Sequence, residues 1–113
     1  MNRVRAVKSL AAMAQDTRLD AFRLLVQAGP QGLAAGDLAT RLDITPPALS
    51  FHLRRLAYAG LVRARQDGRF IYYSADYDSM QSLVDFLMEN CCGGAACAPA
   101  RATGRRGIAR RLS

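Results

Sequence analysis

Apolar residues in the middle of the chain recur with the period of an amphipathic helix. Leu49, Leu53 and Leu56 follow one another at intervals of four and three residues, so they lie on one face of a helix predicted over residues 48–59. Gly60 follows at the position where a glycine commonly ends a helix in a left-handed conformation. The leucine stripe therefore predicts a helix whose other side faces solvent.

The pattern then changes to the alternation of β-strands. Residues 62–65 alternate apolar and basic side chains, residues 70–73 are aromatic and β-branched, and an Asp-Gly turn signal separates them. A shorter helix is predicted over residues 36–42, followed by a turn in which Thr45 can cap the next helix and Pro46 can open it. Helix, turn, helix and hairpin in this order form a winged helix-turn-helix, whose second helix enters the major groove of DNA.

Three more helices are predicted, which gives a mainly α fold of about five helices with a β-hairpin wing. They cover residues 2–14, 16–28 and 77–90. Their apolar stripes consist of Val4, Val7 and Leu10; of Leu19, Phe22, Leu25 and Val26; and of Met80, Leu83, Val84, Leu87 and Met88. Little else in the chain can cover the first and last stripes, so we expect them to form a homodimer interface.

Length and charge fit one small DNA-binding domain. The chain has 113 residues, a net charge of +7 and a pI of about 10.2. Residues 44–75 carry five arginines and one aspartate, as expected of a unit that meets phosphates. No apolar run is long enough for a membrane span and no signal sequence opens the chain, so we expect a cytoplasmic protein. Neither a nucleophile–base pair nor a glycine-rich phosphate loop is present, so an enzyme is not predicted.

Three cysteines lie within seven residues after the last predicted helix. Cys91, Cys92 and Cys97 are separated by small residues, so Cys97 can return toward the other two at little loop-closure cost. No fourth cysteine or histidine lies nearby to complete a tetrahedral zinc site. Three thiolates suit a soft ion that accepts three ligands, such as As(III) or Sb(III), with Cd or Pb as alternatives. Oxidation of the thiols is a further alternative.

The combination of these features resembles the ArsR/SmtB family of winged-helix metalloregulatory repressors. The resemblance extends over residues 7–97 and is strongest in Asp37-Leu38-Ala39, residues 45–56, Ala59-Gly60-Leu61-Val62 and the hairpin. It implies a homodimer that represses a resistance operon and leaves double-stranded operator DNA when an ion binds. Residues 34–38 lack the Cys-Val-Cys-Asp-Leu motif of the best-known arsenic sensors, so the resemblance is to the subgroup with paired cysteines after the last helix.

The resemblance also implies where DNA and the ion bind. The start of the second helix of the motif contributes DNA contacts, although Pro46 and Phe51 stand where the family usually has polar residues. The two arginines that follow are expected at phosphates, and the wing arginines at phosphates or the minor groove. The expected DNA-binding residues are Thr45, Pro46, Ala48, Ser50, Phe51, Arg54, Arg55, Arg65 and Arg69, and the expected ion ligands are Cys91, Cys92 and Cys97.

Two further expectations concern the single histidine and the domain boundaries. His52 lies one turn from two core leucines, so we expect a packed, hydrogen-bonded side chain rather than a metal ligand. Residues 1–92 are predicted to form the DNA-binding and dimerisation domain, and residues 93–113 a flexible tail with a basic, arginine-rich end. A winged helix that contacts protein or RNA remains an alternative, which a duplex-binding assay would separate.

Overall fold

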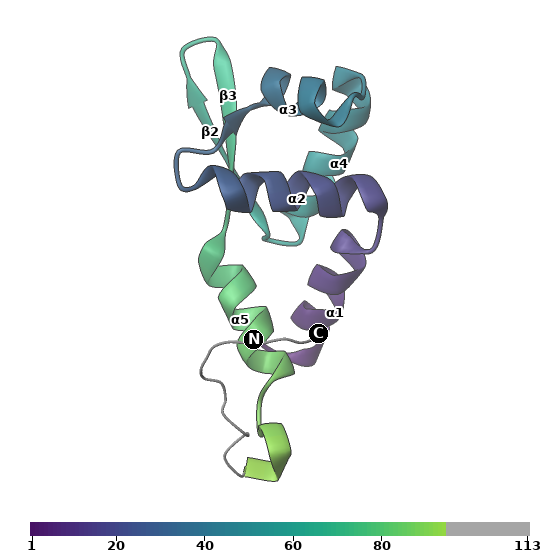
Figure 1. Ribbon diagram of the computed structural model, residues 1–113, viewed down its shortest axis with the longest axis vertical. Coiled ribbons are helices and arrows are strands. Elements are labelled where there is room, and N and C mark those ends of the chain that lie inside the picture. The colour runs from purple at the N-terminus through teal and green to yellow at the C-terminus, as the bar shows by residue number, and fades with distance from the viewer. Residues whose placement is uncertain (95–113) are drawn as a thin grey trace.

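The computed structural model describes residues 1–94; positions 95–113, with Cys97 and the predicted basic tail, lie outside the described residues. The elements are α1 (Arg3–Met13), α2 (Asp16–Ala28), β1 (Leu33–Ala34), α3 (Ala35–Leu42), α4 (Pro46–Tyr58), β2 (Val62–Asp67), β3 (Phe70–Ala75), α5 (Tyr77–Leu87) and a 3₁₀ turn, η1 (Cys91–Gly94). Figure 1 shows α3 and the β2–β3 hairpin at one end of the long axis, and α1 and α5 extending toward the other. The predicted winged helix-turn-helix is confirmed.

The sheet has three antiparallel strands in the order β1-β3-β2. In the hairpin, Val62 pairs with Ala75 and Asp67 pairs with Phe70, which leaves a two-residue turn. Gly68 opens that turn with φ +62°, a left-handed conformation that favours glycine. The predicted hairpin is therefore confirmed, with the aspartate of the turn signal as the last residue of β2.

The third strand, β1, lies between α2 and α3 and pairs with β3. Leu33 pairs with Tyr73 of β3, and Gly32 precedes the pair with φ +76°. A Cβ atom built on Gly32 would lie 2.1 Å from the Tyr73 carbonyl oxygen, so only glycine permits this approach. The strand is too short to show alternation in the sequence.

The core lies where α2, α3 and α4 meet the base of the hairpin. Its fully buried side chains are Leu25, Leu38, Leu49, Leu53, Leu56 and Leu61. Each contributes about 1.5–3 kcal/mol by leaving water. The prediction for α2 was wrong at two positions, because Leu19 and Val26 are 44% and 39% exposed. The face of α2 that points inward is centred on the buried Ala21 and Phe22. Leu19 and Val26 each lie about a quarter turn or more around the helix from that centre, so they are partly exposed.

The last helix is shorter than predicted. It ends at Leu87 rather than at Asn90, and Asn90 has a left-handed backbone with φ +56° that interrupts the helical path. The η1 turn follows directly. No helix among residues 1–94 has the length and apolarity that crossing a membrane requires.

Candidate functional site

Caps on both sides of the turn fix the start of α4 relative to α3. Asp43 closes α3 in a left-handed conformation (φ +55°), and its N–H donates to the Thr40 carbonyl at 3.2 Å. Thr45 then caps α4, because its hydroxyl accepts from the Ala48 N–H at 3.4 Å. Two prolines occupy the first two helical positions, where a backbone N–H would have no partner within the helix. The predicted cap, Thr45, and the predicted first helical residue, Pro46, are confirmed, so the helix begins two residues before residue 48.

The side of α4 opposite its buried leucines is open to solvent. Phe51 is 46% exposed and Tyr58 is 78% exposed. The Arg55 guanidinium lies 5.1 Å from the centre of the Phe51 ring, within the range of a cation–π contact. We call the exposed residues at the start of α4 and on its solvent side the outer face of α4; they are Thr45, Pro46, Ser50, Phe51, Arg54 and Arg55. Ala48, also expected at DNA, is half-buried.

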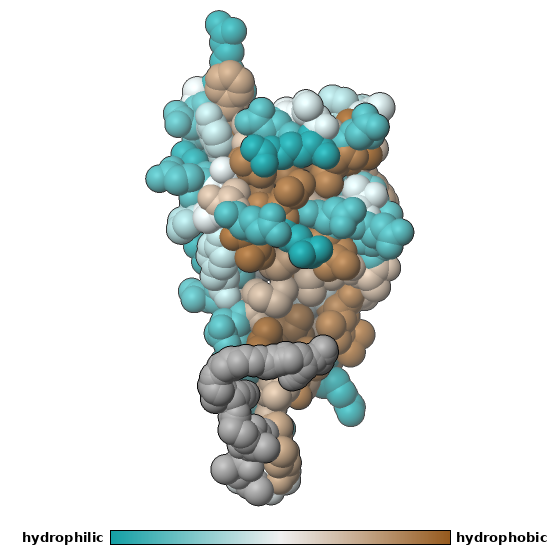
Figure 2. All heavy atoms as spheres, in the orientation of Figure 1, coloured by the Kyte–Doolittle hydropathy of each residue, from teal (hydrophilic) through white to brown (hydrophobic). Residues whose placement is uncertain are grey.

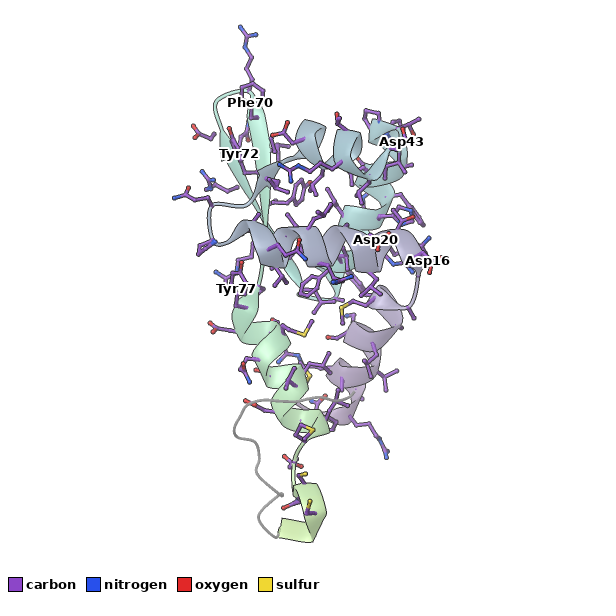
Figure 3. The ribbon with its side chains drawn as sticks, viewed as in Figure 1. Asp16, Asp20, Asp43, Phe70, Tyr72 and Tyr77 are labelled. Carbon is purple, nitrogen blue, oxygen red and sulfur yellow. The ribbon has the colours of Figure 1, made fainter. Side chains whose placement is uncertain are left out.

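The wing carries two exposed arginines that were expected to contact DNA, Arg65 and Arg69. The Arg65 guanidinium donates to the Gln31 carbonyl at 3.1 Å and lies 4.9 Å from the centre of the Tyr72 ring. Figure 3 shows Tyr72 on the strand that returns from the tip of the wing. Arg65 is therefore held along the wing, and Arg69 belongs to the turn at its tip.

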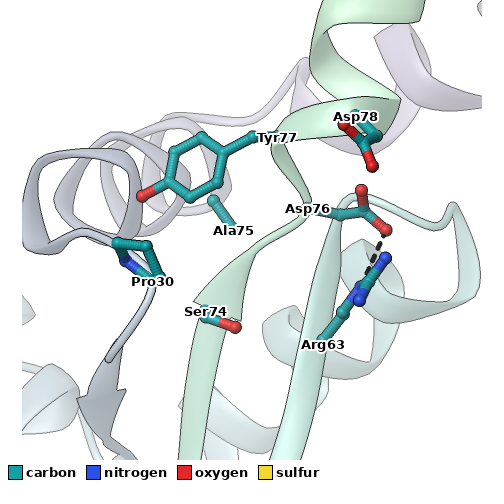
Figure 4. A pocket seen from close by; sticks show the side chains of 7 residues that line it. All are labelled: Pro30, Arg63, Ser74, Ala75, Asp76, Tyr77 and Asp78. Atoms are coloured by element: carbon teal, nitrogen blue, oxygen red, sulfur yellow. Dashed lines mark hydrogen bonds and ion pairs between the residues drawn. The ribbon is translucent and has the colours of Figure 1, made fainter.

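The third wing arginine, Arg63, has a different role from its neighbours. Its Nε lies 3.0 Å from an Asp76 carboxylate oxygen, at the junction between β3 and α5 (Figure 4). The other carboxylate oxygen of Asp76 accepts from the Ser79 N–H at 3.0 Å and so caps α5. The Tyr77 hydroxyl donates to the Val26 carbonyl at 3.0 Å. The start of α5 is thus bonded to both the wing and the end of α2.

The same contacts set the protonation of Asp76. Burial alone would raise the pKa of Asp76, but the Ser79 backbone N–H and the Arg63 guanidinium stabilise the carboxylate, and the net pKa is lowered. The sequence alone does not reveal the ion pair, because the two partners lie thirteen residues apart on different elements.

The single histidine is hydrogen-bonded, as predicted, although it is half-buried rather than in the core. Nδ1 of His52 lies 3.4 Å from an Arg18 guanidinium nitrogen, and the same arginine donates through Nε to the Ala12 carbonyl. Burial lowers the pKa of His52, and the positive charge of Arg18 lowers it further. The neutral ring therefore accepts from Arg18 and joins α4 to α2 and the end of α1.

The thiol pair lies just beyond α5. Cys91 opens η1 with its N–H bonded to the Met88 carbonyl at 3.0 Å. The Cys91 and Cys92 sulfur atoms are 3.6 Å apart, and Cys92 is left-handed with φ +59°. Cys97, the third predicted ligand, lies outside the described residues. Among residues 1–94 no cluster of three or more Cys, His, Asp or Glu side chains is assembled.

Apolar side chains of α1 and α5 are left uncovered at the end of the molecule away from the wing. Val4 and Val7 are 76% and 59% exposed, and Leu87 and Met88 are 56% and 57% exposed. Only Ala6 and Ser9 of α1 are buried against the rest of the chain. Figure 2 shows apolar side chains on the lower part of the visible face, where α1 lies. This surface is the one that the sequence assigned to a second copy.

Comparison with known proteins identifies the class. Residues 13–65 match a family model described as a helix-turn-helix domain. The transcriptional activator HlyU of Vibrio cholerae is 31% identical over 91 residues, which is 80% of this chain and 82% of that protein. The structure of an ArsR-like transcriptional regulator from Rhodococcus sp. RHA1 superposes with a TM-score of 0.68 at 27% identity, covering 80% of this chain and 82% of that one. The chain is a winged helix-turn-helix transcriptional regulator and not an enzyme.

A further relative narrows the assignment. The cadmium resistance transcriptional regulatory protein CadC homolog of Staphylococcus aureus is 30% identical over 84 residues, 74% of this chain and 68% of that protein. With the ArsR-like structure and the shared winged helix, these matches place the chain in the ArsR/SmtB family. The chain spans slightly less than two thirds of two other curated relatives, at 63% and 62% of their lengths.

Proposed function

We propose that the protein is a cytoplasmic, homodimeric repressor of a metalloid-resistance operon, released from operator DNA when As(III) or Sb(III) binds Cys91, Cys92 and Cys97. The thiol pair carries the proposal, since the Cys91 and Cys92 sulfurs lie 3.6 Å apart. With a metal–sulfur bond of about 2.3 Å, two sulfurs on one ion lie at most about 4.6 Å apart, so the spacing of this pair is within the span that one ion can bridge. Thiolate ligands favour soft, thiophilic ions.

The DNA side of the proposal uses the outer face of α4 and the wing. Thr45, Pro46, Ala48, Ser50 and Phe51 would approach base edges at the start of the helix. The residues assigned to the phosphate backbone are Arg54, Arg55, Arg65 and Arg69. A homodimer through α1 and α5 would set its two α4 helices about one DNA turn apart, roughly 34–36 Å.

The position of α5 supports a route from thiols to DNA. The start of α5 is bonded to the wing through the Asp76–Arg63 pair and to α2 through Tyr77. The exposed Leu87 and Met88 at its other end belong to the proposed dimer surface. Thiols closing on an ion at its far end would therefore change both the dimer geometry and the placement of the wing. A coupling of about 1–3 kcal/mol would lower operator affinity roughly 5- to 150-fold.

The test is operator binding by fluorescence anisotropy under reducing conditions, titrated with arsenite, cadmium or zinc. Cys91→Ser and Cys92→Ser should bind DNA like the wild type and no longer release it with arsenite. Glu89→Gln, in the same segment with all thiols intact, is the matched control and should release normally. Normal release of DNA by Cys91→Ser or Cys92→Ser would exclude the thiol site. Release of the wild type by cadmium but not by arsenite would mean that the inducing ion is cadmium and not As(III).

The short sulfur–sulfur distance also supports a second candidate, a thiol-redox regulator. Hydrogen peroxide would oxidise the Cys91 and Cys92 thiols to a disulfide, and the peroxide would be reduced to two water molecules. DNA release by peroxide that dithiothreitol reverses, together with no response to arsenite, would favour this candidate. Release by stoichiometric arsenite in the presence of reductant would exclude it as the main signal.

A further inference from the structure

The outer face of α4 has an apolar centre where a DNA-reading helix commonly presents polar groups. Phe51 is 46% exposed although it has a large ring, and it lies opposite the buried Leu49, Leu53 and Leu56 stripe. Tyr58, two turns further on the same side, is 78% exposed. The helix carries two arginines and no acidic residue. A ligand that complements this surface would offer both an apolar group for the exposed Phe51 ring and negative charge for the arginines.

The surroundings of Phe51 orient its ring. The His52 ring meets it edge-on, with centroids 5.5 Å apart, and the Arg55 guanidinium lies 5.1 Å from the ring centre. Phe51, Arg54, Arg55 and Tyr58 together line a shallow hollow of about 190 Å³. The ring is thus held between the neutral His52 ring and the Arg55 guanidinium, with one part of its surface open to solvent.

One group in duplex DNA matches this arrangement. In the major groove the thymine C5-methyl is the apolar group that separates an A·T pair from the others, and phenylalanine is among the side chains that contact it. The phosphates on either side of the groove match the two arginines. A second copy of the same basic face would bring like charges together instead, so charge complementarity favours DNA.

We propose that Phe51 contacts a thymine C5-methyl group and selects thymine at one position of each operator half-site. The inference rests on the proposed function, because it requires that the outer face of α4 enters the major groove. The proposed role of Phe51 is to select thymine at one position, and not to raise the affinity for DNA of any sequence. Arg54 and Arg55 then supply binding that does not depend on sequence.

The experiment replaces thymine by deoxyuridine, which keeps every hydrogen-bonding group and lacks only the methyl. A duplex selected by the wild-type protein from a random library is synthesised with single thymine-to-deoxyuridine replacements. We expect one position per half-site at which the replacement lowers wild-type affinity about fourfold. Phe51→Ala should bind the thymine duplex more weakly and lose the difference between the two bases.

Arg54→Gln is the matched control on the same face. It should weaken binding to both duplexes equally and reduce the salt dependence of the affinity, while the preference for thymine persists. The wild-type comparison needs no variant, so misfolding of Phe51→Ala cannot leave the proposal undecided.

Three outcomes would overturn the proposal. The first is wild-type binding that is equal for thymine and deoxyuridine at every position. The second is a Phe51→Ala variant that keeps the full preference. The third is a Phe51→Ala variant that lowers the sedimentation coefficient of DNA-free protein, which would show that the face joins two copies. If no duplex is enriched or bound at all, the proposed function itself fails, and this is distinguishable from bound DNA without methyl discrimination.

Discussion

The two ends of the molecule differ in how much of their structure one chain supplies. At the wing end, the α4 leucines are buried, α4 is capped by Thr45, and the hairpin is paired along its length. At the other end, α1 and α5 contact each other but leave Val4, Val7 and Leu87 more than half exposed. The first end is complete in one copy, whereas the second has an apolar surface of the kind that a partner normally covers.

This difference matches a division of labour. Under the proposed function the wing end contacts DNA, and one copy of the chain supplies its caps and core. The end formed by α1 and α5 would transmit the signal in that proposal, and shifts of helices at subunit interfaces are a common form of such switching. The Asp76–Arg63 pair lies between the two ends and connects them. Substitutions at each place should therefore have different signatures.

The largest effect is expected in the core of the wing end. Leu56→Ala removes a fully buried side chain from α4 and should lower the free energy of unfolding by about 2–5 kcal/mol. Urea unfolding at two protein concentrations should show the same loss at both. Leu87→Ala is the matched leucine at the other end, and its loss should be small and should change with protein concentration. A concentration-independent loss of equal size at both positions would contradict the inference that only the end formed by α1 and α5 depends on a second copy.

The next effect concerns the apolar surface of α1 and α5. Leu87→Glu should raise the dimer dissociation constant about 100-fold or more, because a carboxylate would be buried without a partner. Sedimentation velocity would measure the shift toward monomer, and operator affinity should fall with it. Ser82→Glu adds the same charge on the opposite side of α5, where the side chain is exposed, and should leave the dimer intact. Dimers unaffected by Leu87→Glu would remove this surface from the interface.

The sequence predicted most of the wing end because its signals are local. Leu49, Leu53 and Leu56 fix the face of α4, Thr45 fixes its start, and the Asp-Gly pair places the hairpin turn. Each of these signals depends on neighbours within a few residues. The family resemblance then followed from their order.

The errors arose where the structure depends on distant contacts. The Arg63–Asp76 pair and the β1–β3 pairing join segments that have no common periodicity. Leu19 and Val26 were expected in the core because they are apolar. The buried face of α2 is narrower than its set of apolar residues, because only Ala21, Phe22 and Leu25 of this helix are buried. The roles of the three thiols and of the DNA-contacting residues remain predictions.

A moderate effect is expected at the junction between the two ends. Asp76→Ala removes the cap of α5 and the partner of Arg63, and should lower the free energy of unfolding by about 0.5–2 kcal/mol at pH 7. Asp76→Asn keeps an acceptor for the Ser79 N–H and should lose less. Asp78→Asn, at an exposed position in the first turn of α5, is the control; it removes only a carboxylate near the helix N-terminus and should lose less than Asp76→Ala.

The same junction predicts a pH dependence. The pKa of Asp76 is lowered in the folded protein, so on acidification the unfolded state binds the proton first and the folded state loses stability. The advantage of the wild type over Asp76→Asn should be complete above the ordinary aspartate pKa of about 3.9 and disappear as the pH falls through the lowered value. Urea unfolding at pH 7 and pH 3 would measure it. If the stability advantage of the wild type over Asp76→Asn grew at low pH, the pKa of Asp76 would not be lowered in the folded protein.

The smallest effect is expected at His52, where α4 meets Arg18. Burial and the Arg18 charge lower the pKa of His52, so the unfolded chain takes up a proton before the folded one as the pH falls below about 6.5. The wild type should therefore lose stability relative to His52→Gln between pH 7.5 and the lowered pKa, and no further below it. Because this is the single histidine of the chain, its imidazole proton resonances would report the pKa directly by NMR. Arg18→Gln removes one of the two causes and should raise that pKa part of the way toward its ordinary value. A His52 pKa above 6.5 in the wild type would mean that the ring is neither buried nor beside the guanidinium, and α4 would then lack this connection to α1 and α2.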